Sequence, residues 1–217
     1  MAAGGYAEHV VCVTSSHFAS AEKEFRFPLD YGNQRPLSAT WTVTGSGAFA
    51  LGLNQKCRAH ITGMTPGRIV DYGLKDSMNM GACMAPAAAD TIERHLEDFH
   101  VQPQEYDRII TGDLGSVGQT VLIDLLREKG IDIAGRHMDC GIEIFDADVQ
   151  DTHAGGSGCG CSAVTLAAYI LPMLESGEWK KVLFLPTGAL LSKTSFNEGK
   201  SVPGIAHAVV LESPVVK

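Results

Sequence analysis

The chain has 217 residues, of which 45% are hydrophobic and 19% are charged, and its formal net charge is −8. These values exclude an intrinsically disordered chain and fit one sizeable domain, or one and a half smaller ones. The acidic charge and the lack of a Lys/Arg run argue against a nucleic-acid partner, because neutralising phosphates needs a basic face. Six cysteines are scattered without a Cys-x-x-Cys pair and no signal-peptide pattern opens the sequence, so we expect a reduced, intracellular protein.

The first quarter of the chain predicts strands separated by a polar segment. Residues 9–14 form the first expected strand, and residues 15–35 read as a short helix and a loop. Residues 40–44 and 48–53 are β-prone. Residues 1–7 resemble the last turn of a helix, so we expect the sequence to be an amino-terminally shortened form of a longer protein.

The remaining chain alternates strands with amphipathic helices, which predicts an α/β sheet with helices packed on it. We expect one helix to begin at Pro86, and the next to begin with a capping box, Ser116 to Gln119, and to close at Gly130. The closing pair of strands should be antiparallel or mixed. The expected strands are 58–71 (one strand or a pair), 106–111, 139–145 (a strand or an extended loop), 180–185 and 205–211.

One uncharged run, residues 154–174, joins a glycine loop to an apolar helix. Four glycines within residues 155–160 let the backbone turn sharply, and free N–H groups at the helix start could hold an anion or an oxyanion. Tight packing against a sheet is the alternative role. The loop lacks the lysine of a phosphate loop, and its apolar part, about a dozen residues, is short of the about 20 that span a membrane. Pro172 should kink the helix or end its regular part.

Several segments together resemble the stage V sporulation protein AD family. They occur in the family's order and span nearly the whole chain, and their combination is highly specific. The segments are TSSH (14–17), FRFP (25–28), TVTGSGA (42–48), MAPAAADT (84–91), HLED (95–98), TGDL (111–114), GGSGC (155–159) and TGALLS (187–192).

The resemblance implies a thiolase-like αβαβα layered fold, an α/β architecture with two βαβαβ-type halves. Against that pattern the chain resembles the end of the first half, residues 1–57, followed by the complete second half, residues 58–217. The helix on which thiolase-like enzymes carry their nucleophilic cysteine has no counterpart in it.

The resemblance also implies a function, which is non-catalytic binding of dipicolinic acid, a pyridine dicarboxylate, and its loading as a calcium chelate into the spore. Membrane proteins of the same operon are the expected partners, and a homodimer is expected because thiolase-like proteins usually dimerise. The implied location is peripheral, on the cytoplasmic face of the inner spore membrane, or in the forespore or mother-cell cytoplasm. We expect no cofactor and no metal site.

Two other classes of function stay open. One is a thiolase-like or ketoacyl synthase-like acyltransferase acting on a coenzyme A thioester, which the missing Cys/His/Asn set argues against. The other is a structural adaptor without a ligand.

Two departures from the condensing-enzyme pattern concern candidate site residues. Asp113 resembles the place of a catalytic His, and Ser157 lies near the place of a second catalytic residue, an Asn or His. Neither side chain can replace an imidazole. The plain reading of Asp113 is a carboxylate that accepts hydrogen bonds from helix N-terminal amides.

The glycine loop supplies our main binding hypothesis. The backbone amides of Gly156, Gly158 and their neighbours could hold one carboxylate of a dianionic ligand. Cys159 could be a reactive thiol, but Cys159 and Cys161 are expected to be small buried packing residues.

Histidines and lysines complete the set of candidates. His17, after a strand end, is well placed for a pocket mouth. His207 lies in the last apolar strand, where a core histidine is the default and a pocket role the alternative. Lys193 and Lys200 border a loop, where solvated charges explain them and attraction of an anion is the alternative.

Overall fold

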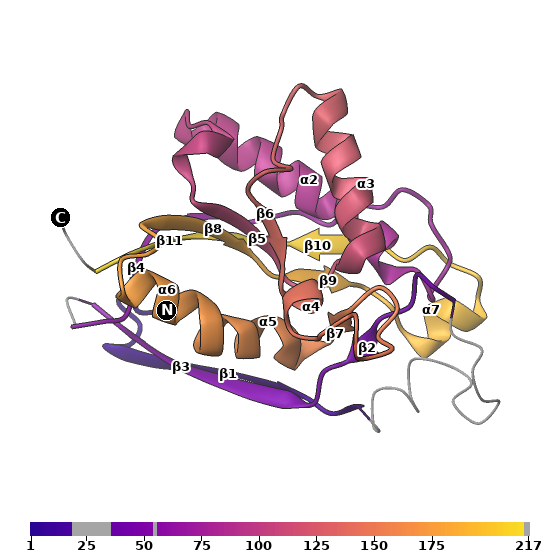
Figure 1. The fold of residues 1–217 in the computed structure, drawn as a ribbon, viewed down its shortest axis with the longest axis horizontal. Coiled ribbons are helices and arrows are strands. Elements are labelled where there is room, and N and C mark those ends of the chain that lie inside the picture. Colours follow the sequence, from indigo (N-terminus) through magenta and orange to yellow (C-terminus); the bar gives the residue numbers. More distant parts are fainter. Residues whose placement is uncertain (19–35, 54–55, 215–217) are drawn as a thin grey trace.

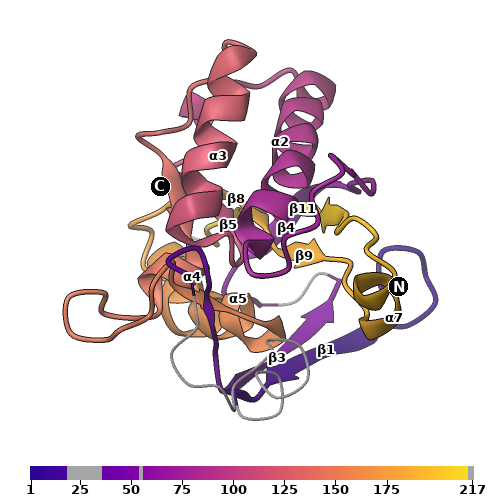
Figure 2. The ribbon, with the colours of Figure 1, turned by 90° about the vertical axis from the view of Figure 1, so that its right-hand side faces the viewer.

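The computed structural model describes residues 1–18, 36–53 and 56–214, and these residues form four layers. Two long helices cover one face of a five-stranded sheet, a central helical segment covers the other face, and a two-stranded ribbon lies beneath that segment (Figures 1 and 2). The long helices are α2 (Met80–Phe99) and α3 (Gly115–Glu128), and the ribbon consists of β1 (His9–Ser16) and β3 (Gly45–Gly52).

The central sheet is mixed, as the sequence predicts. Its inner strands β8 and β5 are parallel, β6 continues parallel to β5, and β11 runs antiparallel to both β8 and β4. The carboxyl ends of β5, β6 and β8 therefore lie at one edge. In spatial order the strands are β4 (His60–Thr65), β11 (Ala208–Glu212), β8 (Lys181–Leu185), β5 (Arg108–Thr111) and β6 (His137–Asp139).

Helix α2 begins at Met80, so the prediction that Pro86 starts the helix is wrong. The Asn79 side chain accepts a hydrogen bond from the Ala82 amide and caps the helix. Pro86 lies inside the helix. Proline has no backbone N–H, so the helix lacks one hydrogen bond there, in a stretch whose side chains are almost all buried. Gly81 of α2 lies against Gly118 of α3, since a Cβ on Gly118 would be 2.8 Å from the Cα of Gly81.

The expected capping box at the start of α3 is also wrong. The helix begins at Gly115, and Leu114 at its N-cap offers no capping side chain. The amide of Ser116 donates instead to the carbonyl of Ala154. The other end agrees with the prediction, because Gly130 follows the helix with a φ of 76°.

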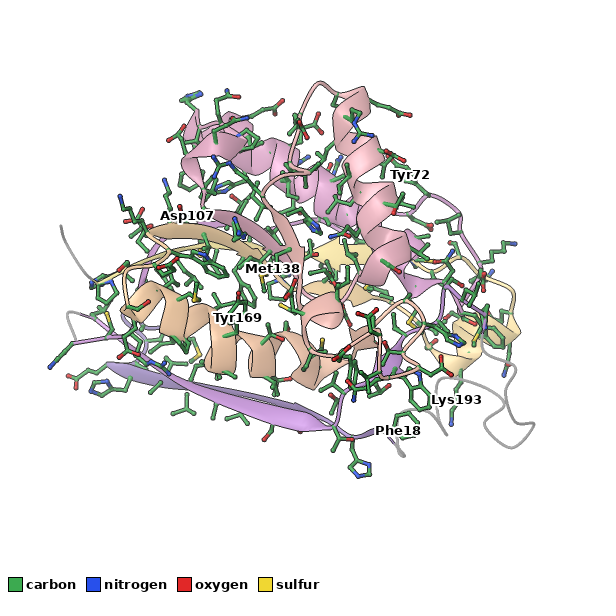
Figure 3. All side chains as sticks on the ribbon, in the orientation of Figure 1. Phe18, Tyr72, Asp107, Met138, Tyr169 and Lys193 are labelled. Carbon is green, nitrogen blue, oxygen red and sulfur yellow. The ribbon has the colours of Figure 1, made fainter. Side chains whose placement is uncertain are left out.

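The opposite face of the sheet packs on one discontinuous helical segment, made of α5 (Cys159–Thr165), a π-helical turn η3 (Leu166–Ile170) and α6 (Leu171–Glu175). The π turn ends two residues before Pro172, which lies at the start of α6, so the regular helix is interrupted close to the predicted position. Met138 points into the core between sheet and helix (Figure 3). Residues 139–145 are not a strand, because β6 ends at Asp139 and the short helix α4 (Cys140–Glu143) follows.

The ribbon packs on α5 through small residues. A Cβ on Gly47 would lie 2.7 Å from the Cβ of Ala163. The opposite face of the ribbon is open, with Val11 66% and Val13 69% exposed. The prediction of strands at residues 9–14 and 48–53 is confirmed.

Short elements complete the described chain. Residues 40–44 contribute only β2, which pairs in parallel with β7 inside the glycine run. Residues 19–35 of the predicted helix and loop lie outside the described residues, and the boundary between residues 57 and 58 stays a prediction. No helix among the described residues is long and apolar enough to cross a membrane. The short elements are β2 (Trp41–Thr42), η2 (Pro103–Glu105), β7 (Gly156–Ser157), β9 (Thr187–Ala189), α7 (Lys193–Asn197) and β10 (Gly204–Ala206).

Candidate ligand-binding site

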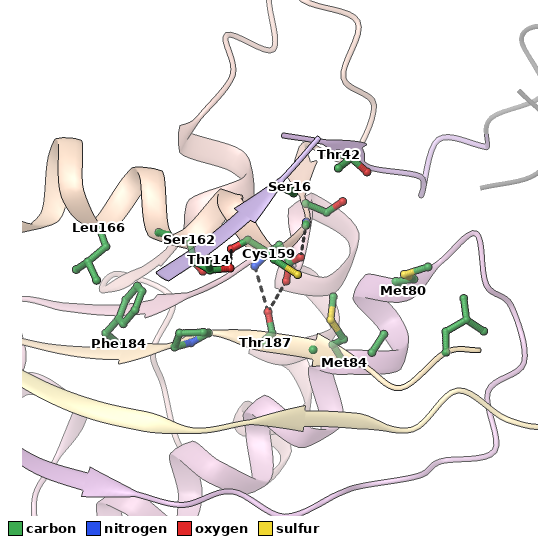
Figure 4. A pocket seen from close by; sticks show the side chains of 18 of the residues that line it. Thr14, Ser16, Thr42, Met80, Met84, Cys159, Ser162, Leu166, Phe184 and Thr187 are labelled. Atoms are coloured by element: carbon green, nitrogen blue, oxygen red, sulfur yellow. Dashed lines mark hydrogen bonds between the residues drawn. The ribbon is translucent and has the colours of Figure 1, made fainter. Parts of the chain in front are cut away.

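A cavity of about 640 Å³ lies between the ribbon, helix α5, strands β8 and β9 and the start of α2. Figure 4 shows the side chains of Cys159, Ser162 and Thr187 pointing into this space. Most of the lining is apolar, and hydroxyl groups interrupt it. The apolar lining side chains include Phe49, Met80, Met84, Leu166, Phe184 and Leu191, and the hydroxyl groups belong to Thr14, Ser16, Thr42, Ser157, Ser162 and Thr187.

Asp113 is half-buried at the wall of the cavity, two residues after β5. Its Oδ2 accepts a hydrogen bond from the amide of Gly158 at 3.0 Å, and its Oδ1 accepts one from the hydroxyl of Thr187 at 2.8 Å. The Thr187 Oγ1 in turn accepts from the backbone amide of Asp113. The carboxylate therefore accepts a hydrogen bond from the amide of Gly158, the N-cap residue of α5, in agreement with the expected pairing with a helix N-terminal amide.

The glycine run is tightly packed. A Cβ on Gly156 would lie 2.8 Å from Ile144, and one on Gly160 would lie 2.5 Å from the carbonyl oxygen of Gly45. Besides the Gly158 amide, the Gly160 amide is paired, because it donates to Ser16 Oγ at 2.9 Å. The tight packing that the sequence analysis gave as one alternative is confirmed. The amides of Gly158 and Gly160 already donate to acceptors within the protein, and the holding of a ligand carboxylate by the loop amides stays a prediction.

The two cysteines of the run differ. Cys161 is buried in the core, and burial raises the pKa of its thiol, as the packing role predicts. Cys159 is exposed and lines the cavity, so the prediction that it is buried is wrong. The cause is position: Cys159 is the first residue of α5 and Cys161 is two residues further on, so their side chains point in different directions.

Of the predicted site residues, the structure brings four to the cavity: Asp113, Ser157, Gly158 and Cys159. Gly156 is adjacent and buried but does not line it. His17 and His207 also do not line it. His207 is exposed, and its Nδ1 accepts a hydrogen bond from the Gly67 amide at 3.0 Å, so the default of a core histidine is wrong. It lies between β10 and β11, where the strands break.

Sequence reasoning missed Thr187, which the structure makes central to the site. It follows β8, and Asp113 follows the parallel neighbour β5. Residues that follow the carboxyl ends of adjacent parallel strands meet at one edge of the sheet, and this pattern could have paired them.

A second carboxylate supports the site from behind. Asp139 is 1% exposed and accepts hydrogen bonds from the hydroxyl of Thr111 and from the amides of Leu114, Gly115 and Gly141, at 2.6 to 3.0 Å. Burial raises its pKa, and these hydrogen bonds act in the opposite direction. Asp139 thereby fixes the loop that carries Asp113.

No group of three or more potential metal-ligating side chains (His, Cys, Asp or Glu) occurs within residues 1–18, 36–53 and 56–214. The titratable side chain that lines the cavity beside Asp113 is the thiol of Cys159. The arrangement can therefore offer a ligand apolar surface, hydroxyl groups, one carboxylate and one thiol.

Solved structures with a similar fold include two enzymes. The tetronic acid condensing enzyme AbyA1 superimposes with a TM-score of 0.57 at 13% identity, covering 98% of this chain and 62% of the enzyme. The 3-oxoacyl-acyl-carrier-protein synthase III of Aquifex aeolicus VF5 gives 0.54 at 15% identity, covering 97% and 59%. At this identity the likeness shows the fold alone. The predicted thiolase-like, ketoacyl synthase-like fold is confirmed.

Sequence comparison gives the family. Stage V sporulation protein AD of Bacillus subtilis (strain 168) is 45% identical over 209 residues, which cover 96% of this chain and 61% of the relative. The chain thus spans less than two thirds of the relative that it matches. The family model described as stage V sporulation protein AD matches residues 1–212. The chain belongs to the stage V sporulation protein AD family, on a thiolase-like fold.

Proposed function

We propose that this sporulation-family protein binds dipicolinic acid in the cavity beside α5 and does not catalyse acyl transfer. The observation that carries the proposal is the cavity itself, whose volume of about 640 Å³ suits a small aromatic ligand. Phe184, Leu166 and Met84 offer apolar surface for a pyridine ring. The hydroxyls of Thr14, Ser162 and other lining residues can donate hydrogen bonds to carboxylate oxygens.

The acid–base chemistry of the lining supports binding over catalysis. Acyl transfer by a thiol needs a base to activate the nucleophile and donors to stabilise the oxyanion. Among the described lining residues, Cys159 has a carboxylate, Asp113, in the same cavity and no imidazole.

An acyltransferase is the second candidate, and the exposed Cys159 in a condensing-enzyme fold is the observation that favours it. Incubation with acetyl-coenzyme A followed by intact mass measurement tests it. A covalent acetyl group on Cys159, absent from Cys159→Ser, would support the enzyme. We expect none.

The family also suggests a setting. We propose that the protein acts beside membrane proteins of its sporulation operon, as a peripheral protein or a homodimer. Co-purification with those membrane proteins from sporulating cells tests this part.

Isothermal titration of dipicolinate into the chain tests the binding. We expect saturable binding that Leu166→Trp weakens at least about tenfold, because the larger side chain fills the cavity. Ala168→Trp is the matched control, since Ala168 is exposed on the same helical segment and does not line the cavity.

The Bacillus subtilis relative is titrated in parallel. Binding by the relative alone would place essential contacts outside the part that this chain matches. Equal affinity of wild type and Leu166→Trp would place the ligand elsewhere, and no binding by either protein would leave the adaptor function.

A further inference from the structure

Four polar side chains form a hydrogen-bonded network behind the cavity wall, and they do not line the cavity itself. Gln119 belongs to α3, Thr111 ends β5, and His137 and Asp139 are the first and last residues of β6. The Gln119 Nε2 lies 2.9 Å from His137 Nδ1, and the His137 Nε2 lies 3.0 Å from Thr111 Oγ1. The Thr111 Oγ1 lies 2.6 Å from Asp139 Oδ2. We call these four residues the Gln119–Asp139 network.

The hydrogen bonds of this network run in one direction. A hydroxyl has one proton, and Thr111 donates its proton to Asp139. The contact between Thr111 and His137 therefore requires the imidazole to donate from Nε2. A neutral imidazole then has an unprotonated Nδ1, which accepts from the amide nitrogen of Gln119. Burial lowers the pKa of His137 to about 4, so the ring is neutral near pH 7.

The network holds the backbone on both sides of Asp113. Thr111 lies two residues before Asp113, at the end of β5. Asp139 accepts hydrogen bonds from the amides of Leu114 and Gly115, the two residues that follow Asp113. Because Asp113 lines the cavity, a shift of this backbone moves the cavity wall.

Burial makes the network sensitive to the loss of one member. Thr111 is 0% exposed and Asp139 is 1% exposed, so water does not readily replace a missing donor. A buried carboxylate that loses a donor is costly, because the desolvated oxygen keeps no partner in exchange. The carboxylate and the amides that it accepts would therefore rearrange together.

We propose that Thr111 and His137 are positioning residues of the ligand cavity: His137, as the Nε2–H tautomer, orients the Thr111 hydroxyl, and this hydroxyl keeps Asp139 and the loop that carries Asp113 in the form that binds ligand. The proposal rests on the proposed function. It gives a role in binding to two side chains that do not themselves line the cavity.

A second buried threonine–histidine pair provides a matched comparison. Thr65 ends β4 as Thr111 ends β5, and the Thr65 Oγ1 lies 2.8 Å from His95 Nδ1. Thr65 is 5% exposed and does not line the cavity. Thr65→Val and Thr111→Val each remove one buried hydroxyl beside a histidine, and the Thr111 hydroxyl is the one that donates to Asp139.

Thermal unfolding and isothermal titration of dipicolinate compare the two variants. We expect each variant to lower the midpoint of unfolding by about 2 to 6 °C. Thr111→Val should weaken binding at least about fivefold, and Thr65→Val less than about twofold. Thr111→Ser keeps the hydroxyl and should bind within about twofold of wild type.

The outcomes separate the two proposals. Wild-type affinity in Thr111→Val, or an equal loss of affinity in Thr65→Val, overturns the positioning role and leaves the proposed function standing. Absence of binding by the wild type overturns the proposed function and the positioning role with it.

Nitrogen-15 spectra of the histidine rings test the network in the wild type. At pH 7 we expect His137 to be protonated at Nε2 and unprotonated at Nδ1. Saturating dipicolinate should shift the ring signals of His137 and leave those of His95 in place, because His95 contacts Thr65 and Tyr106 instead of the network. An Nδ1–H tautomer, or His137 signals that dipicolinate leaves unchanged, would overturn the role given to His137.

Discussion

Two neighbouring parallel strands, β5 and β6, lead into aspartates that accept hydrogen bonds from backbone amides, and the two sites differ in what encloses them. Asp139, at the end of β6, is 1% exposed and accepts four hydrogen bonds. Asp113, beyond the end of β5, is half-buried, accepts from Gly158 and Thr187, and faces the cavity.

The different enclosure of the two aspartates gives Asp139 a role in stability and leaves Asp113 accessible from the cavity. The donors around Asp139 lie within the sheet edge, α3 and α4, so removing the carboxylate would leave three buried amides without this acceptor. The donors around Asp113 border open space, where water or a ligand can replace a lost contact. Hydrogen bonds from backbone amides to an aspartate thus stabilise the buried sheet edge at Asp139, whereas at Asp113 they form part of the wall of the cavity.

The largest effect is expected from Asp139→Ala. Loss of the acceptor shared by Leu114, Gly115 and Gly141 should lower the free energy of unfolding by about 4 kcal/mol. Urea denaturation measures it. Asp124→Ala on the exposed face of α3 is the control and should cost less than about 0.5 kcal/mol. A similar cost for both variants would contradict the role given to Asp139.

A buried histidine of α2, His95, makes the stability of the protein depend on pH. His95 lies between the hydroxyls of Thr65, 2.8 Å away, and Tyr106, 2.6 Å away, and burial lowers its pKa to about 4. The unfolded chain takes up this proton near pH 6.5, before the folded one, so stability is complete above pH 6.5. We expect stability to fall by up to about 3 kcal/mol as the pH drops from 6.5 to 4.

Thermal unfolding of wild type and His95→Gln between pH 7 and pH 4 measures this loss. The variant should show a shallower decline, with the remainder due to His137, whose pKa burial also lowers to about 4. Identical slopes would exclude His95 as a cause.

A pair of glycine variants compares the backbone near each aspartate. Gly141→Ala would place a Cβ 2.2 Å from the carbonyl oxygen of Gly156, and we expect a loss of about 2 to 3 kcal/mol. Gly158→Ala meets its first neighbour, Thr42, at 3.1 Å, and its φ of 99° with a ψ of 165° lies in a region essentially restricted to glycine, so a loss of about 1 to 2 kcal/mol is expected. Chemical denaturation ranks the two, and the reverse order would contradict the comparison.

The smallest effect is expected from Thr187→Val. The variant loses the hydrogen bond that Thr187 donates to Asp113 and the one that it accepts from the Asp113 amide, but the site faces the cavity. We expect the free energy of unfolding to fall by about 1 kcal/mol, measured from the shift of the denaturation midpoint. Thr120→Val, on the exposed face of α3, is the control. A loss of stability as large as that of Asp139→Ala would mean that the Asp113 site is as well shielded from solvent as the Asp139 site.

Local patterns in the sequence were enough for much of the fold. Apolar periodicity predicted α2 and α3, short apolar runs predicted β8 and β11, and the glycine run was tied to a helix that changes character near Pro172. These features depend on neighbours within a few residues along the chain, so local propensity and spacing carry them. The family motifs pointed to the same layered architecture.

The start of α3, the exposure of Cys159 and the cavity wall were decided only by the tertiary structure. Asp139 caps a helix that begins 24 residues earlier, Gly158 donates to a carboxylate 45 residues away, and Thr187 meets Asp113 across 74 residues. A buried polar group takes whichever partner the packed layers bring within reach, and sequence spacing does not encode that choice. The sequence alone determined the family, the layered fold and the glycine loop, while the packing of the layers decided which charge faces the cavity.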